Sequence, residues 1–103
     1  MSRGPWRGDG PRARAVAILR EVLERGARAA PLVALRGEGL SEPDRGLLRE
    51  LVLGVLRWKD ALDGEIAGTS RIPLQRLAPN LREILEVALY QVRHLDRVPD
   101  YAA

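Results

Sequence analysis

Hydrophobic side chains recur every three or four residues along most of this chain, and this spacing limits the available folds more than any other feature. The repeat is clearest within residues 44–57, where apolar side chains fall on two adjoining rows of one helix surface: Leu47, Leu48, Leu51, Val52, Val55 and Leu56. No stretch alternates apolar and polar residues for long enough to make a strand. The sequence therefore predicts an all-α fold of antiparallel helices joined by short loops.

Local signals indicate where the first helices begin and end. Pro11 suits the first position of a helix, where a missing N–H costs nothing, and Gly26 is expected to end that helix. Its buried stripe is predicted to contain Ala15, Ile18, Leu19, Val22 and Leu23. Residues 31–35 are a short helix candidate. The sequence therefore places two helices before residue 37.

Ser41 carries the clearest helix-start signal, because its hydroxyl can accept a hydrogen bond from the backbone N–H of Asp44. A long central helix is expected to begin there. Gly54 inside it costs about 1 kcal/mol relative to alanine, which indicates the close approach of a neighbouring helix. A further helix with Leu62 and Ile66 inward is expected to end at residues 68–70, and residues 73–78 are expected to form a short turn or helix.

The last strong helix is predicted to begin at Pro79 or Asn80 and to end before Val98 and Pro99. Its inward set is predicted to be Leu81, Ile84, Leu85, Ala88, Leu89 and Val92, and its outward set Arg82, Glu83, Glu86 and Arg93. Residues 99–103 resemble the first turn of another helix. We therefore expect a bundle that is truncated before its last helices.

The composition excludes several kinds of chemistry. With 103 residues the chain is long enough for one domain, and it contains no cysteine and a single histidine, His94. Disulfides, cysteine nucleophiles and histidine clusters that bind metal are therefore excluded, and no metal site is expected. The N-terminus lacks a signal-peptide pattern and no apolar run could span a bilayer, so we expect a cytoplasmic protein without a membrane partner.

Positive charge is concentrated at the N-terminal end. Residues 1–28 have a net charge of +4, whereas the remaining 75 residues have a net charge of −1. An excess of arginine attracts phosphate, since each neutralised phosphate releases counterions. Coding bias toward arginine and a solvated helix face are the alternative explanations. The charge pattern alone favours binding to nucleic acid.

Several motifs in order resemble one known family. They are Leu51-Val52 with Gly54-Val55-Leu56-Arg57, then Leu62-Asp63, then Ile84-Leu85 with Leu89-Tyr90-Gln91, and finally Leu95-Asp96-Arg97-Val98-Pro99 with Tyr101-Ala102-Ala103. The series resembles the N-terminal, NusB-like domain of the Sun/Fmu/RsmB family of 16S ribosomal-RNA cytosine-C5 methyltransferases. The resemblance covers residues 12–103, and the ordered series is more specific than any of its parts.

The resemblance implies that RNA engagement and catalysis belong to separate domains. Residues 1–10 would be a flexible basic arm, and residues 11–103 a helical domain that helps to engage ribosomal RNA. A catalytic domain in the same polypeptide would bind S-adenosylmethionine and carry the catalytic cysteines. This chain has no cysteine and no glycine-rich turn after a strand. Neither catalytic residues nor a cofactor are therefore expected in it, although the parent protein is expected to be a methyltransferase.

The predicted RNA-binding residues lie mainly in the arm and the first helix. The planar guanidinium group of arginine can donate paired hydrogen bonds to phosphate and can stack on exposed bases. The candidates are Arg7, Arg12, Arg14, Arg20, Arg25, Arg28, Arg57 and Lys59. For Arg57 a structural role at a helix C-terminus is favoured over RNA contact. Tyr90 is expected to pack with its hydroxyl bonded, and His94 to cap a helix or lie on the surface.

Carboxylate pairs such as Asp60 with Asp63, or Glu83 with Glu86, are interpreted as charged outer faces rather than catalytic groups, since nothing apolar is expected to raise their pKa values. Three functions remain open. The first is an RNA-binding accessory domain of a methyltransferase. The second is a NusB-type antitermination or protein-interaction module, whose partner would be a ribosomal protein and whose exposed apolar surface would include Val33, Leu35 and Val98. The third is an intact enzyme seen only in part.

Overall fold

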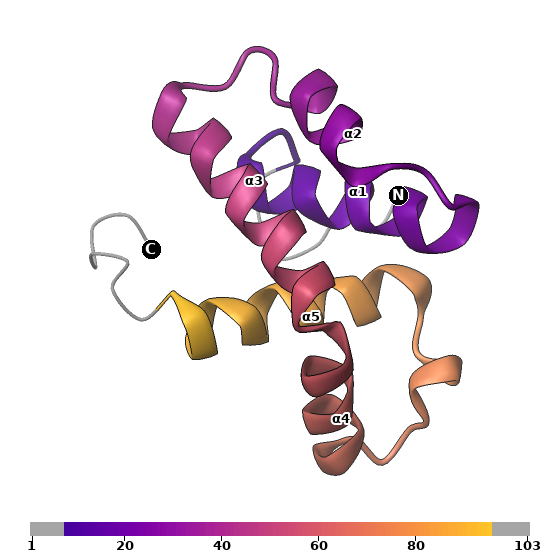
Figure 1. The fold of residues 1–103 in the computed structure, drawn as a ribbon. Coiled ribbons are helices and arrows are strands. Elements are labelled where there is room, and N and C mark those ends of the chain that lie inside the picture. Colours follow the sequence, from indigo (N-terminus) through magenta and orange to yellow (C-terminus); the bar gives the residue numbers. More distant parts are fainter. Residues whose placement is uncertain (1–7, 96–103) are drawn as a thin grey trace.

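The computed structural model describes residues 8–95, and these form five α-helices, one short 3₁₀ helix and no strand. The helices are α1 (Pro11–Arg25), α2 (Ala29–Arg36), α3 (Glu42–Arg57), α4 (Lys59–Thr69) and α5 (Pro79–His94), with η1 (Leu74–Arg76) between the last two. Figure 1 shows their arrangement. The all-α prediction is confirmed.

The predicted end signals act as expected. Ser41 accepts a hydrogen bond of 3.3 Å from the Asp44 backbone N–H and so begins α3. Gly26 ends α1 in the left-handed conformation, with φ at 68°, and its N–H donates to the Val22 carbonyl. α5 ends at His94, before Val98 and Pro99 as predicted, and Leu95 follows it with φ −120° and ψ 42°. Residues 96–103, where a further helix was expected, lie outside the described residues.

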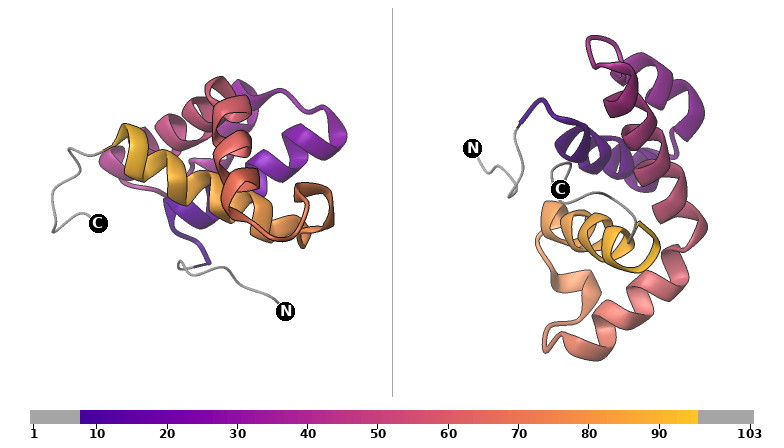
Figure 2. Two further views of the ribbon diagram at one scale, coloured as in Figure 1. Left: turned by 90° about the horizontal axis from the view of Figure 1, so that it is seen from below. Right: turned by 90° about the vertical axis from the view of Figure 1, so that its left-hand side faces the viewer.

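The core is built around α3, which packs against α1, α2, α4 and α5. Of its predicted apolar rows, Leu47 and Leu56 are partly buried, and the fully buried side chains are Leu48, Leu51, Val52 and Val55. From α1 the core receives Ala15, Ile18 and Leu19. In Figure 2, right, α3 and α4 follow one another along an arc, and α1 and α5 lie on its inner side. The prediction that this helix is central is confirmed.

Gly54 of α3 lies directly against the Tyr90 ring of α5. A methyl group added there would lie 2.1 Å from Cζ of the Tyr90 ring, far inside contact distance. The expected close approach of a neighbouring helix is therefore confirmed. Tyr90 occupies the space that a side chain at this position would need.

The predicted faces of α5 are partly wrong. Leu81 and Val92, expected inside, are 42% and 68% exposed, whereas Glu83 and Glu86, expected outside, are buried. Val87 is fully buried as well. The reason is that basic side chains of α1 and α4 reach Glu83 and Glu86 and make their burial possible. The sequence of α5 alone gives no sign of these partners.

Candidate nucleic-acid interface and neighbouring surfaces

Two arginines in the first turn of α1 bind other parts of the fold. Arg12 donates from Nε to the Gln91 side chain on α5 at 2.7 Å. Arg14 donates to three backbone carbonyls, those of Asp9 at 2.9 Å and of Arg36 and Glu38 at 2.8 Å each. These bonds attach the start of α1 to α5 and to the loop after α2. Both predicted site residues therefore have structural contacts in this state.

Arg20, in the middle of α1, is also paired. Its guanidinium lies 2.5 Å from Glu24 on the same helix and 3.8 Å from Glu83 on α5. Burial raises the pKa of Glu83, and the nearby positive charges of Arg20 and Arg82 offset part of that rise. Arg20 therefore compensates a buried carboxyl group between α1 and α5.

Lys59 belongs to a buried network between α4 and α5. Its Nζ donates to Asp63 at 2.5 Å and to Glu86 at 3.0 Å, and Arg82 donates to Asp63 at 3.0 Å. Burial opposes the charged form of Lys59, but its bonds to the two carboxyl groups raise its pKa overall. The Lys59 side chain therefore points into the fold, so it could contact RNA only by leaving this network.

The pKa values of the two acids in this network shift in opposite directions overall. Burial raises the pKa of Glu86 to about 8, and the closeness of Asp63 adds to the rise. Burial also acts on Asp63, but its contacts with Glu86, Lys59 and Arg82 lower its pKa overall. The expectation that nothing raises a pKa in the Glu83 and Glu86 pair is wrong, because both side chains are enclosed between helices.

Three of the predicted arginines are exposed and have no hydrogen-bond or ion-pair partner among residues 8–95. Arg25 ends α1, Arg28 precedes α2, and Arg57 ends α3. Figure 1 shows the α1 to α2 connection well separated from the joint of α3 and α4. The unpaired predicted cations thus lie at two separate sites on the surface rather than along one continuous stripe. Arg7 lies outside the described residues.

The sequence interpretation missed two similar cations, Arg45 and Arg49, on the exposed side of α3. They also lack a hydrogen-bond or ion-pair partner within the described part of the chain. Their four-residue spacing, on the side opposite the apolar rows, was the signal that could have identified them. They extend the basic surface beyond the N-terminal end.

Three aromatic rings stack where α3, α4 and α5 meet. The ring of His94 lies 4.8 Å from that of Trp58 and 4.9 Å from that of Tyr90, with interplanar angles of 23° and 24°. Tyr90 is buried and donates its hydroxyl hydrogen to Glu50, as its predicted packing role requires. His94 is exposed, as expected of a surface residue. We call these three rings the aromatic stack.

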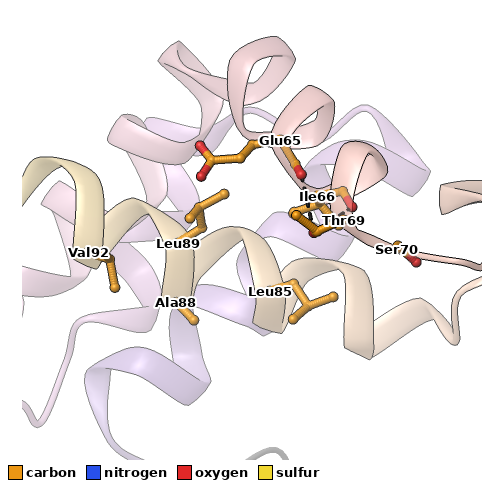
Figure 3. A pocket seen from close by; sticks show the side chains of 8 residues that line it. All are labelled: Glu65, Ile66, Thr69, Ser70, Leu85, Ala88, Leu89 and Val92. Carbon is orange, nitrogen blue, oxygen red and sulfur yellow. Dashed lines mark hydrogen bonds between the residues drawn. The ribbon is translucent and has the colours of Figure 1, made fainter.

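An apolar groove of about 550 Å³ lies between α4 and α5. Figure 3 shows the side chains that line it: Glu65, Ile66, Thr69, Ser70, Leu85, Ala88, Leu89 and Val92. Most of these are apolar. The exposed apolar surface predicted around Val33 and Leu35 is smaller, since Val33 is buried and only Leu35 is exposed, and Val98 lies outside the described residues. Among the described helices, none is long and apolar enough to cross a membrane.

Comparison with known proteins agrees with the all-helical fold. The sequence profile of the NusB family matches residues 9–103. The chain is 40% identical over 88 residues to a "probable ribosomal RNA small subunit methyltransferase B" of Synechocystis, and 39% identical over 69 residues to one of Bacillus subtilis. It is 34% identical over 92 residues to the ribosomal RNA small subunit methyltransferase B of Pectobacterium carotovorum. No solved structure matches significantly.

The matched segments differ greatly in their share of each protein. They cover 84%, 67% and 89% of this chain but only 20%, 15% and 21% of the three relatives. The chain therefore spans about a fifth of the length of these relatives. The match to the family profile runs through nearly the whole chain, and the chain belongs to the NusB family.

Proposed function

We propose that this domain binds ribosomal RNA as the accessory domain of a small-subunit ribosomal-RNA cytosine-C5 methyltransferase. The observation that carries the proposal is the pair of exposed, unpaired arginines at the α1 to α2 connection, Arg25 and Arg28, in a NusB family chain whose relatives are named as ribosomal-RNA methyltransferases. Arg12, Arg14 and Arg20 contribute less directly, by holding α1 in place. RNA contact is thus centred on the end of the arginine-rich helix.

The catalytic part of the proposed enzyme is a separate domain in the same polypeptide. The relatives are about five times as long as the segment that they share with this chain, which leaves room for such a domain. The family resemblance assigns S-adenosylmethionine to it. The described helices do not fit this cofactor, because a Rossmann-like site needs parallel strands and a glycine-rich turn. We therefore assign no step of methyl transfer to these residues. Reading the gene beyond Ala103 tests the proposal directly, since an open frame encoding such a domain is expected.

Replacing Arg25 and Arg28 together by glutamine tests the RNA contact. The variant should bind purified small-subunit ribosomal RNA at least about tenfold more weakly at 0.1 M salt, because two phosphate contacts are lost. The slope of log affinity against log salt concentration should fall by about 2, or about 1 for each contact. A filter-binding titration at several salt concentrations measures both quantities.

Arg71 and Arg76 provide a matched control. They are exposed and unpaired in the described structure, Arg71 precedes η1 and Arg76 is its last residue, and their replacement by glutamine removes the same charge. This control variant should retain most of the affinity. Equal losses in the two variants would mean that only net charge matters. Failure of the unmodified domain to bind the RNA would refute the proposed function.

A second candidate function, protein interaction, is favoured by the groove between α4 and α5. An exposed apolar surface of this kind is typical of a contact site for protein. Its proposed occupant is the catalytic domain of the same polypeptide. A domain linked to this one in the same polypeptide is held close to the groove at high effective concentration. A ribosomal protein is the alternative occupant.

A further inference from the structure

The aromatic stack runs from the core to the surface, and its inner end is fixed. Tyr90 is 4% exposed, its ring fills the space above Gly54, and its hydroxyl donates to Glu50. His94 lies against this ring from the last turn of α5. The inner two rings therefore form a rigid base on which the third ring rests.

The outer end of the stack is open. Trp58 is 44% exposed although part of its ring lies against His94. Its backbone is fixed, because its N–H donates to the Gly54 carbonyl at 3.0 Å and its carbonyl accepts from the Leu62 N–H at 2.9 Å. Trp58 ends α3 and precedes α4, so its ring stands at the joint of two helices. A large flat ring is thus held in one place with much of its surface in contact with water.

One exposed cation, Arg57, stands directly before Trp58 and suits a phosphate. Arg57 is exposed and unpaired among the described residues, whereas Lys59 points into the buried network. The apolar groove is elsewhere, since Val92 precedes His94 by two residues and therefore lies about 200° around α5 from it. The exposed ring is not part of that groove. An acidic residue, Asp60, follows Lys59 in α4, so a phosphate is expected on the side of Arg57.

We propose that Trp58, supported by His94, is a stacking platform for one unpaired base of single-stranded RNA, with Arg57 binding an adjoining phosphate. This inference rests on the proposed RNA binding and adds a second contact, away from the α1 to α2 connection. Stacking on an aromatic side chain accepts any base, because every base has a π face. A ring that is already immobilised loses little conformational freedom when the base stacks on it.

Fluorescence of Trp58 tests the contact. The chain has two tryptophans, so the Trp6→Phe variant reports on Trp58 alone. Titration with a single-stranded 12-nucleotide RNA rich in adenosine should quench this fluorescence over the same concentrations at which anisotropy of the labelled RNA rises. Binding without quenching would overturn the platform and leave RNA binding intact. If the 12-nucleotide RNA does not bind, the platform is overturned, whereas the proposed function is overturned only if ribosomal RNA does not bind either.

A double-mutant cycle separates stacking from a purely structural role. Trp58→Leu should weaken binding of the 12-nucleotide RNA about tenfold, which is within the range for loss of one stacked base. An RNA of the same length with abasic positions should bind the unmodified protein about tenfold more weakly than the intact RNA does. Trp58→Leu should bind the abasic RNA and the intact RNA with equal affinity. Trp58→Phe should restore most of the affinity, because it restores an aromatic face.

The control for this cycle is Leu53→Ala, which truncates another exposed hydrophobic residue of α3. It should leave the affinity for both RNAs unchanged. Circular dichroism shows whether Trp58→Leu is folded. If it is not folded, Trp58→Phe takes its place: like the unmodified protein, it should bind the abasic RNA less well than the intact RNA. Equal sensitivity of Trp58→Leu and the unmodified protein to the missing bases would overturn the platform.

Discussion

Glu86 carries a buried carboxyl group, and its protonation therefore affects the stability of the fold. The side chain is fully buried, and its Oε1 has no hydrogen-bond partner within the described structure. Its pKa is raised to about 8, whereas an ordinary glutamate ionises near 4.5. Between these two values the folded state binds a proton that the unfolded state has released. The contribution of Glu86 to stability is therefore fully present below pH 4.5 and is lost as the pH rises toward 8.

Glu86→Gln should remove this dependence, because an amide of the same shape does not titrate. Relative to the variant, the unmodified protein should lose about 4 kcal/mol of its free energy of unfolding between pH 5 and pH 8.5. Urea unfolding at four or five pH values measures the difference. Asp63 does not interfere, since its pKa is lowered and its contribution is lost only in acid.

Glu65, which is only partly buried and pairs with Arg93, serves as the control. Glu65→Gln should leave the pH dependence of the unmodified protein in place. A constant difference between the unmodified protein and Glu86→Gln across this range would show that Glu86 is ionised in the fold.

At the scale of the element, α5 separates what a sequence pattern can and cannot predict. Its apolar period was enough to predict a helix, and Ile84 and Leu89 do pack against the core. Choosing its buried face required knowledge of Arg20 and Lys59, which come from other helices. By contrast, α3 was predicted almost completely, because its apolar rows are surrounded by other helices. A single-helix pattern works where burial is apolar and fails where it depends on ion pairs.

Two valines of α5 give a direct test of its orientation. Val87→Asn should lower the free energy of unfolding by about 3 kcal/mol, because it places an unpaired amide in the core. Val92→Asn should change it by no more than about 0.5 kcal/mol, because that side chain is 68% exposed. Thermal or urea unfolding of both variants decides the matter. The apolar pattern alone predicts a severe loss for Val92 instead, so the opposite order would contradict the described orientation.

On the scale of the whole molecule, the candidate site was only partly predictable. The excess of charge near the N-terminus pointed to arginine, and Arg25, Arg28 and Arg57 are indeed exposed. Nothing in the sequence showed that Arg14 would bind three backbone carbonyls or that Lys59 would point inward. These bonds join segments far apart in the chain. The aromatic stack was missed for the same reason, because Trp58 and His94 meet only in the folded state.

The groove and the basic surfaces are expected to act independently, because they lie on different parts of the molecule. If the catalytic domain occupies the groove, Val92→Asp should weaken its association with this domain at least about tenfold, since a carboxylate buried against an apolar partner has no counter-ion. The two parts, produced separately, can be mixed and their binding measured by calorimetry. Val92→Asp should bind ribosomal RNA nearly as well as the unmodified domain, and Arg25→Gln with Arg28→Gln should associate normally with the catalytic domain. The variant with all three changes should then lose affinity for the catalytic domain as Val92→Asp does and affinity for RNA as the arginine variant does, as expected of sites without shared contacts. Unaltered association of Val92→Asp would exclude the groove as the binding site of the catalytic domain. The proposal for the RNA-binding surfaces would still stand.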